Sequence, residues 1–319
     1  MDTVPAGDPE SWTYPAFSAT IADGTLWGRG TADNKIGTCA STMAFRAIRS
    51  LGIDLKGDII FTHVADEEKG GKFGFRNILD SGYAEGVDYL FYGHGGRKEQ
   101  IGIAANGSAS VVITVKGLAA HTRALEDGIN AVEKAAELIV WLKKLGDEVN
   151  KREYPLPGTD TIMRSRFSVN KCQGYVSTNT VPDKCEIIID RRTTPGESIQ
   201  DAETEIRSVV KLMAAEDPDL DAEVSFNTRM DVSVSPADSE IVKSFQRAAE
   251  KVVGIKPVPV GGSHSSDHGY FVTTHGKPVA SYGTGGVGTH MADEHIAVEE
   301  IIRTTKVYAL TMLDLLGAE

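Results

Sequence analysis

The sequence has 319 residues, with 33 Lys plus Arg against 45 Asp plus Glu, and a formal net charge of −12. This length predicts about two domains and a large core, and the 41% hydrophobic and 24% charged residues are typical of a globular protein. The acidic balance argues against nucleic acid as the main partner, because phosphate binding depends on clustered Lys and Arg. No apolar run reaches the about 18 residues of a membrane span, so we expect no membrane partner.

The three cysteines are Cys39, Cys172 and Cys185, and they lie far apart in the sequence. An odd number without a Cys-x-x-Cys pair favours free thiols in a reducing compartment, and we therefore expect a cytoplasmic protein. The same spacing makes a thiolate zinc site an unfavourable interpretation.

The first third of the chain alternates helical and strand patterns. The expected elements are a helix at 34–51, a buried strand at 57–64, a short helix at 75–79 and a strand at 87–92. This rhythm predicts an α/β domain with a mostly parallel sheet covered by helices. Ligands bind such sheets at the carboxyl ends of strands, where Glu67, Glu68 and His94 are expected to lie.

The middle of the chain changes pattern and then returns to the first one. Strands are expected at 108–116, 165–169, 184–190 and 222–227, interleaved with helices at 128–149 and 198–215. This order predicts an α+β sandwich inserted into the larger domain. The last part has an expected helix at 239–253, a strand at 278–282 and a helix at 298–316. The predicted domains are 1–106 and 229–319, which form one catalytic domain, and the inserted segment 107–228.

Five side chains in loops carry the chemistry that stands out. Asp33 begins a helix, where a helix N-cap is the simpler interpretation. Glu67 and Glu68 are adjacent, and two such carboxylates favour a bound cation or a proton between them. His94 and His290 are also loop residues, and each alone suits a solvated side chain. Together, imidazole and carboxylate groups suit zinc in a hydrolytic site with a position open for water.

Several segments, in order along nearly the whole chain, resemble those of the di-zinc metallopeptidase and amidohydrolase family of carboxypeptidase G, aminoacylase, acetylornithine deacetylase and succinyl-diaminopimelate desuccinylase. The matching segments are Asp2-Thr3-Val4-Pro5, Gly28-Arg29-Gly30-Thr31-Ala32-Asp33-Asn34-Lys35, Asp66-Glu67-Glu68, Gly117-Leu118-Ala119-Ala120-His121, Gly128-Ile129-Asn130-Ala131, Asn179-Thr180-Val181-Pro182, Asp190-Arg191-Arg192, Ser265-Ser266-Asp267 and His290 to Glu294.

The resemblance implies two divalent metal ions, with zinc expected and cobalt or manganese as alternatives. Asp33 would bridge the ions, Glu68 and His290 would bind the second, and His94 would bind the first. Glu67 would be the general base that takes a proton from the attacking water.

The resemblance also implies a homodimer formed through the inserted segment, which would be a lid or dimerisation domain. His121 would reach into the partner subunit's site and polarise the substrate carbonyl. Asn179, Arg192 and Ser265 would hold the substrate, although Arg191 can play the part of Arg192. The expected substrate is an N-acyl amino acid or a small peptide with a free carboxylate.

One departure from the family concerns its first motif, His-x-Asp. Asp2 matches the Asp, which orients the His from outside the ligand shell, but the His itself would precede Met1. The strands that come before this motif in relatives are also missing, through a gene start placed too late, a fragment, or a natural short form. We therefore keep two hypotheses, a metal-dependent amide hydrolase and a catalytically impaired dimeric ligand-binding relative.

Overall fold

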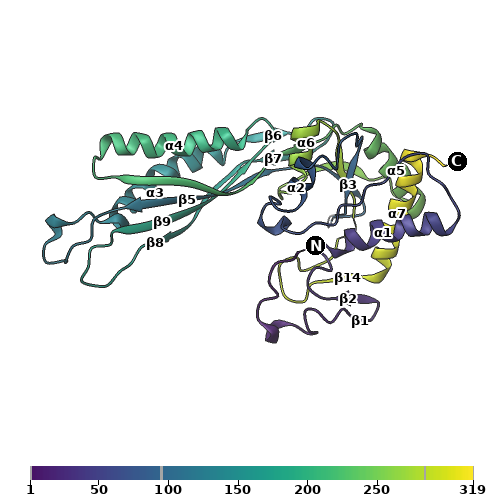
Figure 1. The fold of residues 1–319 in the computed structure, drawn as a ribbon, viewed down its shortest axis with the longest axis horizontal. Coiled ribbons are helices and arrows are strands. Elements are labelled where there is room, and N and C mark those ends of the chain that lie inside the picture. Colours follow the sequence, from purple (N-terminus) through teal and green to yellow (C-terminus); the bar gives the residue numbers. More distant parts are fainter. Residues whose placement is uncertain (1, 94–95, 284, 319) are drawn as a thin grey trace.

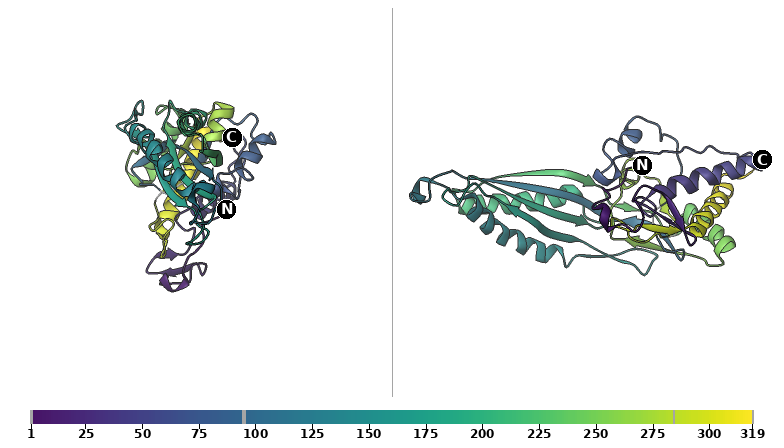
Figure 2. Two further views of the ribbon diagram at one scale, coloured as in Figure 1. Left: turned by 90° about the vertical axis from the view of Figure 1, so that its left-hand side faces the viewer. Right: turned by 90° about the horizontal axis from the view of Figure 1, so that it is seen from below.

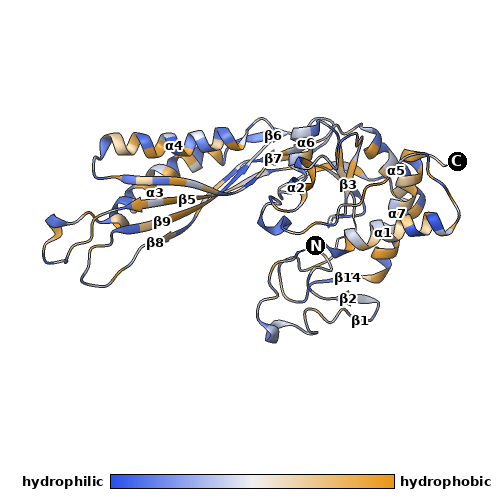
Figure 3. Ribbon diagram, viewed as in Figure 1, coloured by the Kyte–Doolittle hydropathy of each residue, from blue (hydrophilic) through white to orange (hydrophobic). Residues whose placement is uncertain are grey.

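The computed structural model describes residues 2–93, 96–283 and 285–318. The molecule is elongated, and a sheet with two helices extends away from a second part that contains both chain ends (Figure 1, Figure 2). Figure 3 shows the apolar sides of the helices turned toward the sheets. None of the helices within these ranges is long and apolar enough to cross a membrane.

The extended part is a four-stranded antiparallel sheet in the order β10-β5-β9-β8. Its elements are β5 (Gly107–Lys116), α3 (Ala131–Val149), β8 (Arg166–Gln173), β9 (Lys184–Thr193), α4 (Ile199–Glu216) and β10 (Asp221–Met230). Alternate residues of β5, such as Val111 and Ile113, are buried with the apolar sides of α3 and α4, as strand periodicity requires. Asn130 and Ser198 cap the two helices by accepting backbone N–H groups.

The other part is built on a mixed sheet and not on the mostly parallel sheet that the sequence predicts. The strands are β3 (Leu90–Tyr92), β4 (Gln100–Ala105), β11 (Ser233–Val234), β12 (Val258–Gly262) and β13 (Val279–Ser281). β12 and β4 are parallel, as are β13 and β3, whereas β11 and β13 are antiparallel to β4. The prediction was wrong because alternating helices and strands do not determine the direction in which β4 crosses the sheet.

Helices cover both faces of this sheet. α1 (Lys35–Ser50), α5 (Glu240–Val253) and α7 (Val298–Leu316) share one apolar core that includes Phe91, whereas α2 (Phe75–Asp80) and α6 (Gly269–His275) share a separate core with Leu90 and Tyr92. Because successive side chains of a strand point to opposite faces, β3 separates the two cores.

The remaining elements are small. β1 (Thr20–Ala22), β2 (Thr25–Trp27) and β14 (His295–Ala297) form an antiparallel sheet, which holds the N-terminal region against the segment before α7. β6 (Glu153–Pro155) pairs with β7 (Ile162–Arg164), and three 3-10 turns lie at η1 (Pro9–Ser11), η2 (Glu67–Lys69) and η3 (Leu125–Asp127).

Residues 57–64 do not form the predicted buried strand. The chain has no strand assignment there, and Ile60 is 55% exposed. The apolar run alone favoured a strand, but a strand needs a neighbour to accept and donate its backbone hydrogen bonds. No strand of the described residues lies beside this segment.

Candidate metal and hydrolytic site

Most of the predicted site residues lie around one cavity of about 1280 Å³. The members of that set are Asp2, Asp33, Glu67, Glu68, Arg192, Ser265 and His290. Glu67 and Glu68 belong to η2 and Arg192 belongs to β9, whereas Asp33, Ser265 and His290 lie in loops before α1, after β12 and before β14. The fold therefore gathers segments that are far apart in the sequence. His94, a predicted ligand, lies outside the described residues.

Asp33, Glu68 and His290 form the centre of this group. Nε2 of His290 lies 3.3 Å from Oδ2 of Asp33 and 3.4 Å from Oε2 of Glu68. One ligand atom from each residue lies within 4.8 Å of the other two. Asn34, not Asp33, caps α1 by accepting the N–H of Gly37, so the Asp33 carboxylate remains available to the cavity.

A buried ion pair fixes the backbone on which Asp33 lies. The Glu294 carboxylate accepts hydrogen bonds from Nη1 of Arg29 (2.6 Å) and from the N–H groups of Gly30 (2.8 Å), Ala32 (2.7 Å) and Asp33 (2.9 Å). Both charged side chains are almost fully buried. The sequence analysis missed this role of Glu294, although its position four residues after His290 within a matching segment was a signal.

Glu67 lies beside the three candidate ligands in an acidic, water-poor environment. Burial, and after it the negative charges of Asp267, Glu68, Asp33 and Asp2, together raise its pKa to about 8. A cation bound nearby would lower this pKa, because its positive charge offsets the repulsion, and would leave Glu67 as the carboxylate that can accept a proton.

The Asp2 side chain contacts the backbone of the same segment. Its two carboxylate oxygens accept the N–H groups of Glu67 and Glu68, each at 3.3 Å. Asp2 therefore orients the two glutamates that the sequence analysis placed in the site.

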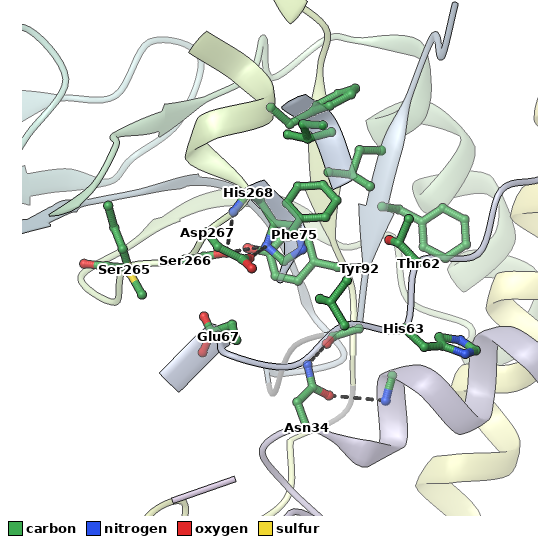
Figure 4. Close-up of a pocket in the computed structure, with 18 of the residues that line it drawn as sticks. Asn34, Thr62, His63, Glu67, Phe75, Tyr92, Ser265, Ser266, Asp267 and His268 are labelled. Atoms are coloured by element: carbon green, nitrogen blue, oxygen red, sulfur yellow. Dashed lines mark hydrogen bonds and ion pairs between the residues drawn. The ribbon is translucent and has the colours of Figure 1, made fainter. Parts of the chain in front are cut away.

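Asp267 is a further acidic residue that the sequence analysis quoted without a role. It is 5% exposed, and burial, followed by the charge of Asp2, raises its pKa to about 6. A Cβ at Gly71 would lie 2.5 Å from Cβ of Asp267, so the left-handed Gly71 (φ +68°) allows the η2 loop to approach it. Figure 4 shows Asp267 and Glu67 turned toward each other across the pocket.

The structure separates the roles of the two adjacent arginines. Nη1 of Arg192 donates to Oγ of Ser265 at 2.8 Å, and both residues line the cavity. Arg191 is 1% exposed and donates to Glu197 at 2.8 Å, away from the cavity. Arg192 is thus the arginine that can contact a ligand.

His121 and Asn179 lie apart from this group. Their segments contact each other, since the N–H of Thr122 donates to the Asn179 carbonyl at 3.1 Å and His121 forms a bridge with Thr180. The segment between β5 and α3, which carries His121, lies at the end of the extended sheet farthest from α1 (Figure 1). Neither residue lines the cavity.

The donor set of the cavity fits a divalent metal ion. Two carboxylates and one imidazole within 4.8 Å are the ligand types that zinc prefers, and Asp2, Glu67 and Asp267 add negative charge around them. The burial that raises the pKa of Asp33 and Glu68 would be offset by a bound cation.

Comparison with known proteins agrees with this geometry. A desuccinylase of succinyl-diaminopimelate from Hydrogenovibrio crunogenus is 28% identical over 99% of this chain and 82% of its own length. An M20 metallo-carboxypeptidase of Sulfolobus solfataricus has the same fold, with a TM-score of 0.78 and 17% identity over 99% of this chain and 84% of its own. A dinuclear metal-binding M20 peptidase of Bacillus subtilis matches with a TM-score of 0.64 and 18% identity over 89% of this chain and 72% of its own. The model of peptidase family M20/M25/M40 matches residues 1–314, and the chain therefore belongs to this family of hydrolases.

Proposed function

We propose that this protein hydrolyses the amide bond of an N-acyl amino acid or a small peptide with a free carboxylate. The observation that carries this proposal is the Asp33, Glu68 and His290 cluster beside the half-buried Glu67. The desuccinylase and peptidase relatives support the choice of an amide bond. The catalytic domain would comprise residues 1–106 and 229–319.

Asp33, Glu68 and His290 would hold one divalent ion, with zinc as the first choice and cobalt or manganese as alternatives. His94, together with Asp33, would bind a second ion. Bound ions supply polarisation of the scissile carbonyl and a lower pKa for the attacking water.

Glu67 acts on protons and not on the metal in this proposal. It takes the proton of the attacking water and then gives it to the leaving amine. Arg192 binds the substrate carboxylate, and Ser265, held by Arg192 at 2.8 Å, presents its hydroxyl to the same end of the ligand. A protein with a net negative charge can bind this carboxylate, because the electrostatic potential at the site depends on the groups that line it, such as Arg192.

A second copy of the chain would complete the site. The segment between β5 and α3, which carries His121, lies at the end of the extended sheet farthest from α1 (Figure 1), and neither His121 nor Asn179 lines the cavity of its own chain. A homodimer that pairs the inserted segments would bring His121 of one copy to the substrate carbonyl of the other. A cytoplasmic location belongs to the same proposal, supported by the free thiols of the three cysteines.

The first test is Glu67→Gln, which keeps the shape of the side chain and removes its basic oxygen. We expect turnover of N-acyl amino acids to fall by at least about 100-fold, with an unchanged metal content by plasma mass spectrometry. Glu137→Gln, on the exposed side of α3, is the control and should change neither. Retained turnover in Glu67→Gln would rule out this residue as the base, and no turnover in the wild type would favour the ligand-binding alternative.

Subunit mixing tests the dimer. His121→Ala and Glu67→Gln proteins, each inactive alone, are unfolded together and refolded as mixed dimers. If His121 acts in the partner's site, about a quarter of wild-type activity returns, because half of the dimers are mixed and each has one complete site. No recovery would show that both residues act within one chain.

A further inference from the structure

Two of the three cysteines meet at the edge of the extended sheet. Sγ of Cys172 in β8 lies 3.6 Å from Sγ of Cys185 in β9. The strand register pairs Cys172 with Ile187, which lies two residues after Cys185. Because alternate residues of a strand share one face, these side chains lie on the same face of the sheet, and the two sulfurs form a diagonal pair across it.

The backbone around this pair allows the sulfurs to come closer. A disulfide needs a sulfur separation of about 2.05 Å, so the observed 3.6 Å must shorten by about 1.5 Å. β8 is the outermost strand of its sheet, beside β9, and its register shifts between Val169 and Lys171, directly before Cys172 (Figure 1). An edge strand next to such an irregularity can make this small movement.

Gly174 keeps the end of β8 close to Cys185. A Cβ at Gly174 would lie 2.7 Å from the carbonyl oxygen of Lys184 and 3.0 Å from Cβ of Cys185. A side chain there would force the two strands apart at this point. Glycine therefore permits the close backbone approach that holds the two cysteines together.

The two thiols differ in their access to solvent. Cys172 is exposed, whereas Cys185 is buried in the core of the extended sheet. Burial raises the pKa of the Cys185 thiol to about 11, so this thiol stays protonated at neutral pH. An oxidant in solution therefore meets Cys172 first, and Cys185 reacts with the neighbour that touches it.

The chain between the two cysteines forms a loop that carries a proposed substrate-binding residue. Residues 174–183 join β8 to β9 and include Asn179. Oγ of Ser177 donates to Oδ1 of Asn179 at 2.8 Å, and Thr180 forms a bridge with His121. A bond between the cysteines would close this loop at its base and restrict its motion.

We propose that Cys172 and Cys185 form a reversible disulfide that fixes the loop at residues 174–183, with a low-molecular-weight disulfide such as oxidised glutathione as the oxidant. The Cys172 thiolate attacks one sulfur of the oxidant, which forms a mixed disulfide and releases one thiolate. Cys185 then loses its proton, and its sulfur attacks Sγ of Cys172 and releases the second thiolate. The released thiolates take up the protons that the cysteines lose, so two cysteine thiols are oxidised while one disulfide is reduced to two thiols. The proposal concerns the extended sheet and does not depend on the hydrolytic function.

Mass spectrometry of the Cys39→Ser protein, which keeps this pair alone, tests the link. Trypsin cleaves after Lys171, Lys184 and Arg191, so the two cysteines fall in separate peptides, 172–184 and 185–191. After incubation with an excess of oxidised glutathione and alkylation of the remaining thiols, we expect these peptides to be joined, with no glutathione retained. The protein should run as a single chain on a non-reducing denaturing gel, and dithiothreitol should separate the peptides again.

Further substitutions separate the two steps of the reaction. With Cys185→Ser added, the second thiol is absent, and Cys172 should retain glutathione as the mixed disulfide. With Cys172→Ser added instead, an exposed side chain is changed, so the protein should fold as before and form neither product. Cys39 of the wild type is the matched control, since it is also exposed and should retain glutathione.

Amide hydrogen exchange measures the effect on the loop. The link should slow exchange at residues 172–184 by about tenfold or more, and should leave β10, the opposite edge of the same sheet, unchanged. The proposal is overturned if Cys172 retains glutathione while Cys185 is present, if the link joins two chains, or if residues 174–183 exchange equally fast with and without it.

Discussion

Glu294 offers the sharpest test of how this site is held together. Its buried carboxylate accepts four hydrogen bonds, one from Arg29 and three from the backbone of residues 30–33. Glu294→Gln keeps the shape but replaces one acceptor oxygen by an NH₂ group. That group then faces two donors, and the Arg29 guanidinium is left buried without its counter-ion.

The magnitude follows from these contacts. Two lost hydrogen bonds to a charged group contribute about 1.5–3 kcal/mol each, which gives about 3–6 kcal/mol. Removal of one partner of a buried ion pair is expected to destabilise by about 3–5 kcal/mol. Both figures describe the same interaction, so they are not added, and we expect the free energy of unfolding to fall by about 3–5 kcal/mol.

Urea unfolding followed by circular dichroism measures this loss, and metal titration measures its effect on Asp33. Because Glu294 fixes the backbone of a candidate ligand, the affinity for zinc should fall by about 10–100-fold. Asp293→Asn is the matched control, since Asp293 is the preceding residue and its contacts, to Thr13 at 2.7 and 2.9 Å, are exposed. It should lose no more than about 1.5 kcal/mol.

A double variant isolates the buried charge. Adding Arg29→Met to Glu294→Gln removes the unpaired cation and should recover part of the lost stability. If Glu294→Gln unfolds within about 1 kcal/mol of the wild type, or no differently from Asp293→Asn, the ion pair does not stabilise the site as argued.

Two other predictions concern stability away from the cavity. Burial acts to raise the pKa of Glu197, but hydrogen bonds from Ser165, the Thr194 amide and Arg152 and the charge of Arg191 lower it from 4.5 to about 2. The contribution of ionised Glu197 to the free energy of unfolding is therefore complete above pH 4.5 and is lost as the pH falls toward 2. Glu197→Gln should lower the free energy of unfolding by about 3–5 kcal/mol at pH 7, while the exposed Glu153→Gln control should lower it by less than about 1 kcal/mol. If the difference in this free energy between Glu197→Gln and the wild type stays constant from pH 7 to pH 2.5, the argument is contradicted. Phe245→Ala removes a fully buried ring that contacts Phe91 and should cost about 3–5 kcal/mol in urea unfolding, against about 0.5 kcal/mol for the exposed Phe17→Ala; equal losses would contradict the assignment of this core.

Local patterns determined most of the elements. The last helix was predicted at 298–316 and is observed at Val298–Leu316, and the helix expected at 239–253 is observed at Glu240–Val253. These predictions were accurate because helix period, cap residues and glycine stops are local properties of the chain. The residues of the acidic cluster were identified by their types and by the family resemblance, since the strand expected before Glu67 and Glu68 does not form.

Contacts between distant segments were decided by the tertiary structure alone. The direction of each strand made the sheet mixed, and residues 57–64 lack the neighbouring strand that would make them a strand. Arg192, and not Arg191, reaches the cavity. The role of Glu294 depends on backbone N–H groups more than 260 residues away in sequence. Periodicity reports which side of an element is buried, but the partner that buries it, and the charge that it meets there, are properties of the folded chain.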